Sequence, residues 1–414
     1  MNSEMQTLKG FRDFVGYDAQ KRIWLIEKIR GVFTAFGFEP LETPVLEYAS
    51  LLTGKYGAEA EKLMYTFTDR GGRAVAMRYD QSVPTARVIA QYQNTLTFPY
   101  KRYQIQPVWR ADKPQRGRYR EFFQCDADII GSTSLVADAE ILALYYAIYQ
   151  AIGIDSFYIE LNDRQMLIEA VKSAGVADDT VLSVIQTIDK IKKVTEEELL
   201  KELESKGVSQ SDGKLLLKNL ANSQPSQNLQ KIMDAAIELG IPKDKLIFVP
   251  TLARGLDYYT GLIFEGNIPE YTVGAVGGGG RYDKLINSLV GVDQPAVGFG
   301  LGFDRTIEAA EELGKIPALN EKKVLVTIFS PEMLSASLEL TKNLRREGVI
   351  AECYSDETQK LEKQIKYALK KGILYLLIVG PYEAAKKTVV VKDLQKNSQE
   401  TISQDKIASY LSEK

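Results

Sequence analysis

Residues 98–131 constrain the fold most, because they have the pattern of two long strands joined by a charged turn. An alternating apolar run ending at Val108 leads into a turn that contains Pro114 and Gly117, and a second run returns through Phe122. Alternation with a period of two residues is typical of strands, and proline and glycine between two such runs are typical of a turn. The sequence therefore predicts an antiparallel hairpin at the centre of the fold.

The side chains of this hairpin predict a site for a ligand that carries both phosphate and amine groups. Arginines and carboxylates crowd on it, namely Arg110, Arg116, Arg118, Arg120, Asp112, Glu121, Asp126 and Asp128. A guanidinium group binds phosphate or carboxylate through two parallel hydrogen bonds, and a carboxylate binds an amine or a magnesium ion. Charged edge hairpins in general are more often solvated surfaces whose ion pairs contribute little. Phe122 shares a strand face with Arg120 and Gln124, which favours a ligand site because a purine base could stack there.

Composition excludes several classes of chemistry. The chain has 414 residues, a net charge of −3, two cysteines and no histidine. It therefore has no imidazole for Ser-His-Asp or Cys-His catalysis, or for a zinc site with histidine ligands. Phosphoryl or nucleotidyl transfer remains open, because that chemistry depends on positioning and charge neutralisation. The nearly neutral charge predicts that any contact with nucleic acid is local.

The N-terminal residues, the apolar runs and the cysteines predict a cytoplasmic protein with no membrane partner. Cys125 and Cys353 lie too far apart in sequence for a disulfide framework, which favours a reducing compartment. The N-terminal residues lack the apolar core of a secretory signal, and no apolar run approaches the length of a membrane span.

Hydrophobic periodicity predicts the remaining elements. The expected helices are 18–37, 85–93, 134–152, 332–346 and 357–371. A second hairpin is expected at 65–77, around a glycine turn, and a strand that leads into a helix at 295–313. Residues 162–240 are rich in Lys, Glu, Leu and Ser and favour a helical insertion on the surface of a sheet domain over a second core layer.

Two further stretches carry organisational information. Gly277 to Gly280 form a run that is typical of a flexible loop, or else of backbone that approaches a ligand closely. After about residue 319, apolar runs alternate with amphipathic helices, which predicts a small α/β domain with a partly parallel sheet.

Four segments, taken in order, resemble the histidyl-tRNA synthetase family of class II aminoacyl-tRNA synthetases. They are MRYDQSVPTAR at 77–87, WRADKPQRGRYREFFQCD at 109–126, LARGLDYYTG at 252–261 and GFGLGFDR at 298–305. The second and fourth look like class II motifs 2 and 3, and the third looks like a segment peculiar to the histidine enzymes. The resemblance covers nearly the whole chain.

The resemblance implies an α+β fold. It consists of a class II synthetase antiparallel sheet flanked by helices, with a helical insertion and a C-terminal α/β anticodon-binding domain. The expected boundaries are 1–160 and 244–320 for the two parts of the catalytic core, 161–243 for the insertion and 321–414 for the anticodon-binding domain.

The resemblance also implies roles for individual residues. Arg110 and Arg254 are the expected catalytic residues, the first holding the α-phosphate and the second neutralising it during transfer. The expected histidine contacts are Asp80, Gln81, Ser82, Arg110, Gln124, Asp128, Arg254, Tyr258 and Tyr259. The expected ATP contacts are Arg110, Asp112, Arg118, Phe122 and Arg305, and those to the tRNA acceptor end are Gln115 and Arg116. Taken singly, Tyr258 and Tyr259 are as well explained as core aromatics, and Arg254 as a partner of Asp257.

The implied activity is ATP-dependent ligation of L-histidine to tRNA(His) through a histidyl-adenylate, with ATP and Mg2+ as cofactors and a homodimer as the working form. The attacking carboxylate is already ionised, so the reaction requires no general base, in keeping with the absence of histidine. Two alternatives are a non-catalytic paralogue that acts as a regulatory subunit in histidine biosynthesis, and an RNA-binding scaffold that retains a synthetase fold. The arginine set and the C-terminal domain argue against both.

Overall fold

The computed structural model describes residues 5–53, 61–115, 118–191, 194–253, 258–319 and 323–413. Its contacts divide the chain into two compact units, Met1–Ile316 and Pro317–Lys414. The finer boundaries expected from the sequence inside the first unit remain predictions.

The first unit is built on a sheet whose strands run in the order β1-β5-β6-β11-β10-β9-β7-β8. Their bounds are β1 Glu39–Pro40, β5 Tyr100–Trp109, β6 Glu121–Ile130, β7 Tyr158–Asp163, β8 Leu246–Phe248, β9 Leu262–Asn267, β10 Gly277–Arg281 and β11 Ala296–Gly302. All neighbouring strands between β5 and β7 in this order pair antiparallel. The pairs at the two edges, β1–β5 and β7–β8, are parallel. The expected antiparallel sheet is confirmed.

The central hairpin is formed by β5 and β6, which pair from Tyr100 opposite Ile130 to Trp109 opposite Glu121. The second expected hairpin is also present, with β3 (Thr66–Thr68) and β4 (Ala74–Met77) pairing in a small sheet that β2 (Leu46–Tyr48) completes.

The glycine run lies in β10, so the flexible-loop interpretation is wrong. A Cβ on Gly279 would lie 2.0 Å from the Gly298 carbonyl oxygen, and one on Gly280 would lie 2.4 Å from that of Leu262. Glycine is required here because the neighbouring backbone leaves no room for a side chain.

One face of the sheet is covered by α1 (Tyr17–Ala35) and α5 (Leu135–Ile152), as the expected helices 18–37 and 134–152 predicted. The Phe33 ring of α1 stacks on Tyr103 at 4.7 Å between centroids, and Tyr145 of α5 contacts Phe299 at the same distance. Among the described helices, α5 alone is long and apolar enough to cross a membrane, but 67% of it is buried inside the unit. Its composition therefore suits a core helix.

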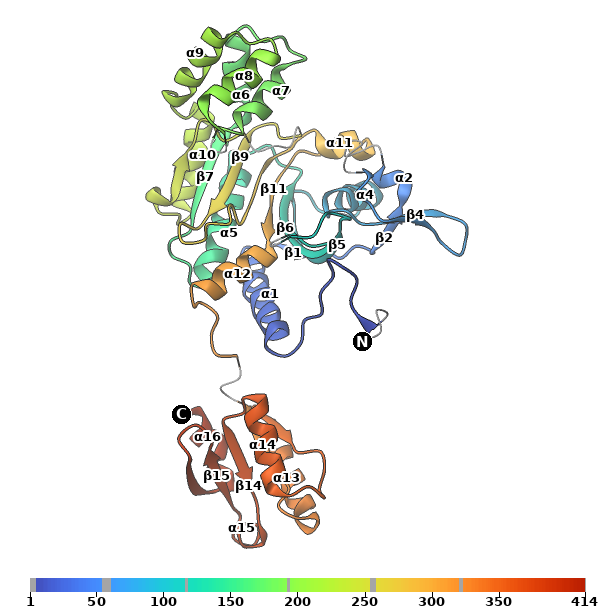
Figure 1. Ribbon diagram of the computed structural model, residues 1–414, viewed down its shortest axis with the longest axis vertical. Helices are drawn as coiled ribbons and strands as arrows, with labels where there is room; N and C mark the ends of the chain where they lie inside the picture. The colour runs from blue at the N-terminus through green and yellow to red at the C-terminus, as the bar shows by residue number, and fades with distance from the viewer. Residues whose placement is uncertain are drawn as a thin grey trace. The chain divides into compact units, whose positions relative to one another are not determined.

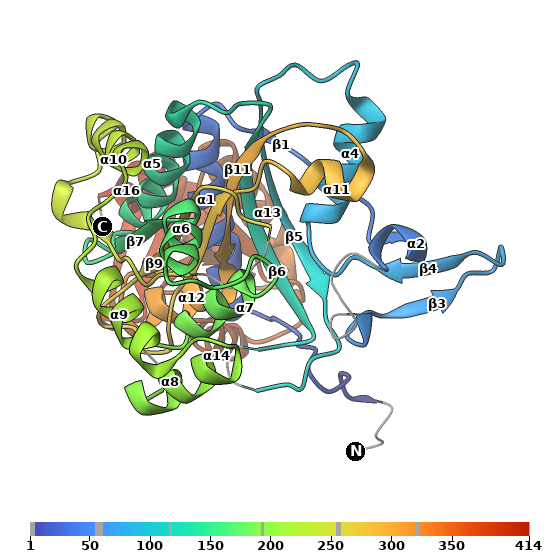
Figure 2. The same ribbon diagram turned by 90° about the horizontal axis from the view of Figure 1, so that it is seen from above.

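The opposite face is partly covered by α4 (Ser82–Tyr92) and α11 (Leu285–Val290), which lie beside each other near β5 and β6 (Figure 2). Ala86 and Ile89 of α4 and Ile286 of α11 pack on Tyr100 and Ile130 at one end of the hairpin. The chain leaves β11 directly into α12 (Phe303–Glu312), as expected, and the short α2 (Ala49–Leu52) follows β2.

Between β7 and β8 the described residues form helices joined by turns, as the interpretation of a helical insertion predicted. They are α6 Arg164–Ser173, α7 Val181–Ile188, α8 Glu196–Ser205, α9 Gln210–Ala221 and α10 Gln227–Glu238. Figure 1 shows α6 to α9 gathered beyond the ends of β7 and β9, whereas α10 packs along α5. The core of this cluster includes Tyr259 and Ile263, so the insertion packs against the sheet domain.

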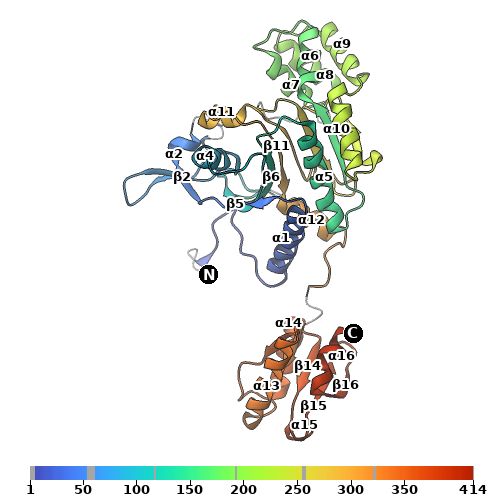
Figure 3. The same cartoon turned by 180° about the vertical axis from the view of Figure 1, so that it is seen from behind.

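The second unit has a five-stranded sheet in the order β13-β12-β14-β15-β16, with helices on both of its faces (Figure 3). Its elements are β12 Lys323–Val326, α13 Leu334–Arg346, β13 Ile350–Cys353, α14 Leu361–Lys371, β14 Tyr375–Ile378, α15 Pro381–Lys386, β15 Thr388–Asp393, β16 Ser398–Ser403 and α16 Ile407–Ser412. The first three strands are parallel and the last two pair antiparallel, which confirms the partly parallel sheet.

Candidate active site

A cavity of about 460 Å³ opens on the face of the first sheet that α1 and α5 leave free. Its floor comes from β6, β10 and β11. Its walls come from the chain that follows β5 and from the beginnings of α4, α11 and α12. Segments far apart in the sequence therefore meet at one concave site.

Alternate residues of β6 form the floor. Phe122, Gln124, Asp126 and Asp128 all line the cavity, as expected for positions two apart on one strand. Opposite them on β11 stand Gly302, Gly300 and Gly298, in register with Gln124, Asp126 and Asp128. A Cβ on Gly298 would lie 1.9 Å from Asp128 Oδ1, so motif 3 supplies glycines to make room for the side chains of motif 2.

One end of the cavity holds the cationic groups expected to bind ATP. The Arg110 guanidinium carbon lies 5.2 Å from the centroid of the Phe122 ring, and its Nε donates to the Tyr79 carbonyl oxygen at 3.0 Å. Arg305 donates from Nη1 to the Ala275 carbonyl oxygen at 2.7 Å. Both arginines line the same cavity, as predicted, and each is held by a backbone carbonyl. Such fixed cations suit a phosphate chain.

The remaining expected contacts at this end are more exposed. Asp112 and Arg118 line the cavity and approach each other to 4.0 Å. Gln115 is not part of the cavity lining, but its backbone forms hydrogen bonds with that of Arg118. Arg116 lies outside the described residues.

The N-terminal segment supports this end of the site, which sequence reasoning missed. The Arg12 guanidinium carbon lies 3.2 Å from the centroid of the Tyr119 ring, and Tyr119 lines the cavity. Arg12 and Arg22 both donate to Asp304, the residue before Arg305. The segment thus joins the motif 2 chain to the beginning of α12.

The other end of the cavity is acidic and buried. Asp128 forms an ion pair with Arg102 of β5 and accepts a hydrogen bond from the Tyr282 hydroxyl. Asp128 was predicted with a role, and Asp126 was named only in the charged set of the hairpin, whereas Arg102 and Tyr282 were not named as site residues. The period-two pattern of β6 could have identified Asp126, because it lies between Gln124 and Asp128 on one face.

Burial governs the ionisation of these groups. It raises the pKa of Asp126 to about 8, an effect that the charge of Arg102 opposes and those of Asp128 and Asp80 reinforce. Burial likewise raises the pKa of Asp128, although Arg102 opposes it, and raises that of Tyr282 well above its usual value. Buried carboxyl groups with raised pKa values are typical of functional sites.

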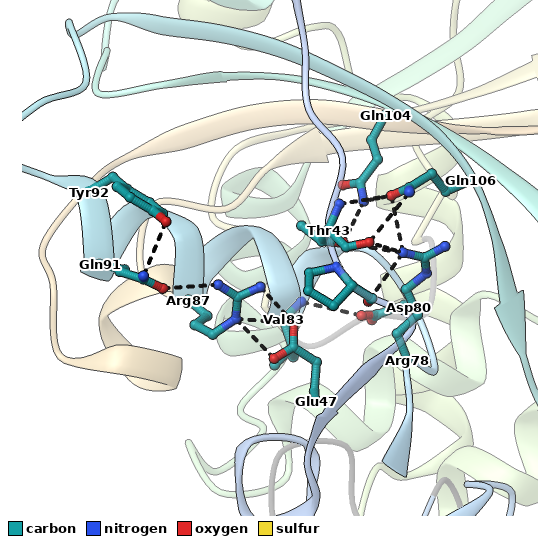
Figure 4. A network of polar contacts seen from close by, with 11 residues as sticks. Thr43, Glu47, Arg78, Asp80, Val83, Arg87, Gln91, Tyr92, Gln104 and Gln106 are labelled. Carbon is teal, nitrogen blue, oxygen red and sulfur yellow. Dashed lines mark hydrogen bonds and ion pairs between the residues drawn. The ribbon is translucent and has the colours of Figure 1, made fainter. Parts of the chain in front are cut away.

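The segment before α4 is held by a buried polar network, shown in Figure 4. Arg78 is 1% exposed; its Nη1 donates to the Thr43 carbonyl oxygen at 2.6 Å and to Gln106 Oε1 at 3.1 Å, and its Nε donates to the Pro107 carbonyl oxygen. These bonds anchor the chain just before Asp80.

The three predicted residues that follow are placed differently from one another. Ser82 lines the cavity as the first residue of α4. Asp80 is buried and accepts from the Val83 amide at 3.3 Å. Gln81 is fully buried and donates to the Gln106 and Gln124 carbonyl oxygens, both at 3.1 Å. Neither Asp80 nor Gln81 is part of the cavity lining, and Gln81 joins α4 to the hairpin.

Tyr258 and Tyr259 both line the cavity, with ring centroids 4.8 Å apart. Tyr259 also packs in the core of the insertion, so the interpretations as a site residue and as a core aromatic both apply to it. Arg254 and Asp257 lie outside the described residues.

Metal binding by the protein alone has no support within the described ranges, where no group of three or more Asp, Glu or Cys side chains is placed to hold an ion. Glu265 of β9 does line the cavity, opposite Gly278 of β10. A single carboxylate together with phosphate oxygens is a suitable ligand set for Mg2+.

Comparison with known families gives two matches that together span most of the chain. Residues 10–306 match the family model described as histidyl-tRNA synthetase, and residues 323–414 match that of an anticodon binding domain. The histidine–tRNA ligase of Rhodopirellula baltica is 40% identical over 413 residues, covering 94% of this chain and 93% of its own. That of Christiangramia forsetii is 37% identical, covering 95% and 96%.

Solved structures agree with these matches. Histidyl-tRNA synthetase from a Nostoc species superposes with a TM-score of 0.88 at 27% identity, covering 99% of both chains. A Bacillus halodurans protein titled as an ATP phosphoribosyltransferase regulatory subunit/histidyl-tRNA synthetase superposes with a TM-score of 0.74, covering 88% of this chain and 96% of its own. At 20% identity the latter shares the fold alone.

Proposed function

Because the chain belongs to the histidyl-tRNA synthetase family, it ligates histidine to tRNA at the expense of ATP. We propose which parts of the cavity bind ATP and which bind histidine. The observation that carries the proposal is the meeting of Arg110 and Arg305 with Asp128 and Tyr259 on one cavity. Guanidinium groups at one end and a carboxylate with a phenol at the other suit a triphosphate and an imidazole side by side.

ATP occupies the end with Phe122. The adenine base stacks on the Phe122 ring with the Arg305 guanidinium on its other face, and Asp112 lies near the adenine amine. Arg118 contacts the terminal phosphates; its side chain is 59% exposed, as a group that meets the outer end of a ligand should be. Stacking a base on an aromatic ring contributes about 1–3 kcal/mol.

Histidine occupies the acidic end. Asp80, Ser82 and Gln124 receive its α-amino group, and Asp128, Tyr258 and Tyr259 surround its imidazole. Gln81 acts by positioning, because its amide is bonded to the hairpin backbone. A pocket that hydrogen-bonds an imidazole rejects apolar analogues, since they would leave its buried polar groups unpaired.

In the first step the histidine carboxylate attacks the α-phosphorus of ATP. The new bond forms from a carboxylate oxygen to phosphorus, and the bond to the leaving diphosphate breaks. Arg110 stabilises the charge that develops on the non-bridging oxygens; its Nε is already held by the Tyr79 carbonyl, so it needs little rearrangement. We assign Arg254 the same role during attack and during transfer to tRNA.

Glu265 would hold the Mg2+ that accompanies ATP, and the ion would supply positive charge that neutralises the phosphates. The residue chemistry fits, because Mg2+ usually binds through one or two carboxylates and substrate phosphates.

The second unit binds the anticodon region of tRNA(His), while Gln115 and Arg116 contact its acceptor end. We further propose the domain boundaries 1–160, 161–243, 244–320 and 321–414, a homodimer and a cytoplasmic location without membrane or DNA partners. Exposed apolar side chains on and beside the small sheet, including Leu46, Tyr48 and Phe67, support an interface near the N-terminus.

The regulatory-subunit alternative is weaker, because the paralogues in question lack the anticodon-binding domain that residues 323–414 match. Histidine-dependent exchange of pyrophosphate into ATP tests the proposal directly. We expect exchange with wild type and a loss of at least about 100-fold in Arg305→Ala. Lys201→Ala, a surface change in the insertion, is the control. Absence of histidine-dependent exchange in the wild-type protein would favour the regulator.

A further inference from the structure

We propose that Asp126 is a specificity-determining residue whose carboxylate accepts the hydrogen bond from imidazole Nδ1, the ring nitrogen next to the side-chain methylene. This inference rests on the proposed function and refines it. The family resemblance pointed to Asp128 for this end of the cavity and gave Asp126 no role.

The position of Asp126 along β6 supports this role. It lies between Gln124 and Asp128 on the cavity face, and each step of two residues along a strand covers about 7 Å. A histidine whose amino group meets Gln124 directs its ring toward Asp128. Asp126 then lies beside the near ring nitrogen.

Asp126, like Gln124, has a buried acceptor without a hydrogen-bond partner. It is 7% exposed, and its Oδ1 is buried without a hydrogen-bond partner. Asp128, in contrast, already binds Arg102 and accepts from Tyr282. A buried acceptor without a partner costs about 1–3 kcal/mol, so its retention in a cavity is best explained by a ligand that supplies the donor.

The strands on either side cannot supply that donor. Gln104, opposite Asp126 on β5, directs its amide to Thr43 Oγ1 at 2.8 Å. Gly300, opposite on β11, has no side chain, and a Cβ there would lie 3.1 Å from Asp126 Oδ1. The free oxygen therefore lies over a glycine that itself lines the cavity.

Charge at this position favours an N–H donor. The charged groups that act on Asp126 are Arg102 from β5, Asp128 from β6, Asp80 before α4 and Arg110 after β5. Two cations thus face three carboxyl groups, counting Asp126 itself, so the region has a surplus of hydrogen-bond acceptors. An imidazole N–H compensates that surplus, whereas an apolar group does not.

Methylated substrates distinguish this contact from a structural role. We expect Asp126→Ala to lower kcat/KM for histidine about 10–100-fold in the exchange reaction, with the KM for ATP changed less than about twofold. Nδ1-methylhistidine cannot donate to Asp126, so its kcat/KM should fall far less than that of histidine when Asp126 is replaced by alanine. The ratio of its kcat/KM to that of histidine should rise about tenfold or more, while the ratio for Nε2-methylhistidine stays constant.

Asp138→Asn is the matched control, because Asp138 is equally buried but pairs with Arg281 outside the cavity lining. It should leave both methylhistidine ratios unchanged. If Asp126→Ala does not fold, Asp126→Asn keeps the shape and removes the charge. The wild-type kcat/KM for histidine should then rise with pH toward 8 because Asp126 ionises there, and the variant should lack this rise.

Unchanged methylhistidine ratios in a folded Asp126→Ala, or equal losses toward histidine and ATP, would overturn the assignment of Asp126 and leave the proposed function standing. If only Asp126→Asn folds, a wild-type pH profile retained in that variant would overturn it as well. A wild-type protein with no histidine-dependent exchange would instead overturn the proposed function, and this inference with it.

Discussion

The cavity of the first unit and the core of the second both bury polar side chains, but they satisfy them differently. In the second unit Gln364 donates to the Ile328 and Gln359 carbonyl oxygens and accepts from the Ile328 amide, all at 2.8 to 2.9 Å. In and beside the cavity, Gln81 Oε1, Gln124 Oε1 and Asp126 Oδ1 are buried without partners. Among the described residues of the second unit, Thr388 Oγ1 is the single such atom.

The difference shows which polar groups serve the fold and which serve a ligand. A fully bonded network such as that of Gln364 specifies one packing of the chain. Buried groups left without partners destabilise the empty protein, and a ligand that binds them recovers this energy as affinity. The comparison therefore predicts that substitutions in the cavity change activity more than stability, and that substitutions at Gln364 do the reverse.

Arg110→Ala should give the largest effect. It removes a fixed cation at the reacting phosphate, so the exchange rate should fall about 10³-fold, with little change in unfolding free energy. Arg110→Lys should recover only part of the rate, because ammonium cannot reproduce the planar fork. Exchange assays and thermal unfolding measure both quantities, and a large loss of stability with modest loss of rate would break the comparison.

Tyr282→Phe should have the next largest effect on activity. Its hydroxyl donates to Asp128, and without that bond the carboxylate is less well oriented. We expect the KM for histidine to rise about 10-fold with the KM for ATP unchanged. Tyr271→Phe removes a hydroxyl that donates to Glu308 at 2.7 Å outside the cavity lining, and should change neither KM.

Gln364→Ala should destabilise the second unit by about 2–3 kcal/mol, because two carbonyl groups and one amide of the backbone lose their partner. Exchange without tRNA should be unaffected. Denaturant unfolding followed alongside exchange activity tests this separation, and a parallel loss of exchange would show that the two units are energetically coupled.

Asp126→Asn should raise the stability of the folded protein, whereas the preceding substitutions lower activity or stability. The pKa of Asp126 is about 8 in the folded protein and near the ordinary 3.8 when unfolded, so the folded state binds the proton more tightly. The resulting stabilisation is full below pH 4 and is lost as pH rises to 8. The neutral variant avoids this loss and should be more stable than wild type at pH 8, by an amount that shrinks as the pH falls. If the difference in melting temperature between the variant and wild type were the same at pH 5 and at pH 8, this prediction would be contradicted.

Much of the architecture could be predicted because periodic patterns carry it. The central hairpin, α1, α5 and the α/β character of the second unit all follow from local alternation or helical spacing. The glycine run of β10 was ambiguous, because its strand conformation depends on β9 and β11, which come from other parts of the chain. Gln81 could not be assigned to the hairpin backbone from sequence for the same reason.

The site divides in the same way. Phe122, Gln124 and Asp128 could be placed on one face of β6 because a strand turns every second side chain the same way. Arg110 follows β5, and only the family resemblance predicted its role. Arg102 and Tyr282 could not, because neither belongs to the matching segments and their contact with Asp128 exists only after β5, β6 and the chain after β10 come together.

The sequence by itself determined the kinds of chemistry available and the order of the segments that perform it, since residue type and local period are properties of the chain. The tertiary structure alone decided which carboxylate retains a free oxygen. Asp126 and Asp128 have the same side chain two residues apart, and they differ only because Arg102 and Tyr282 reach one of them and not the other.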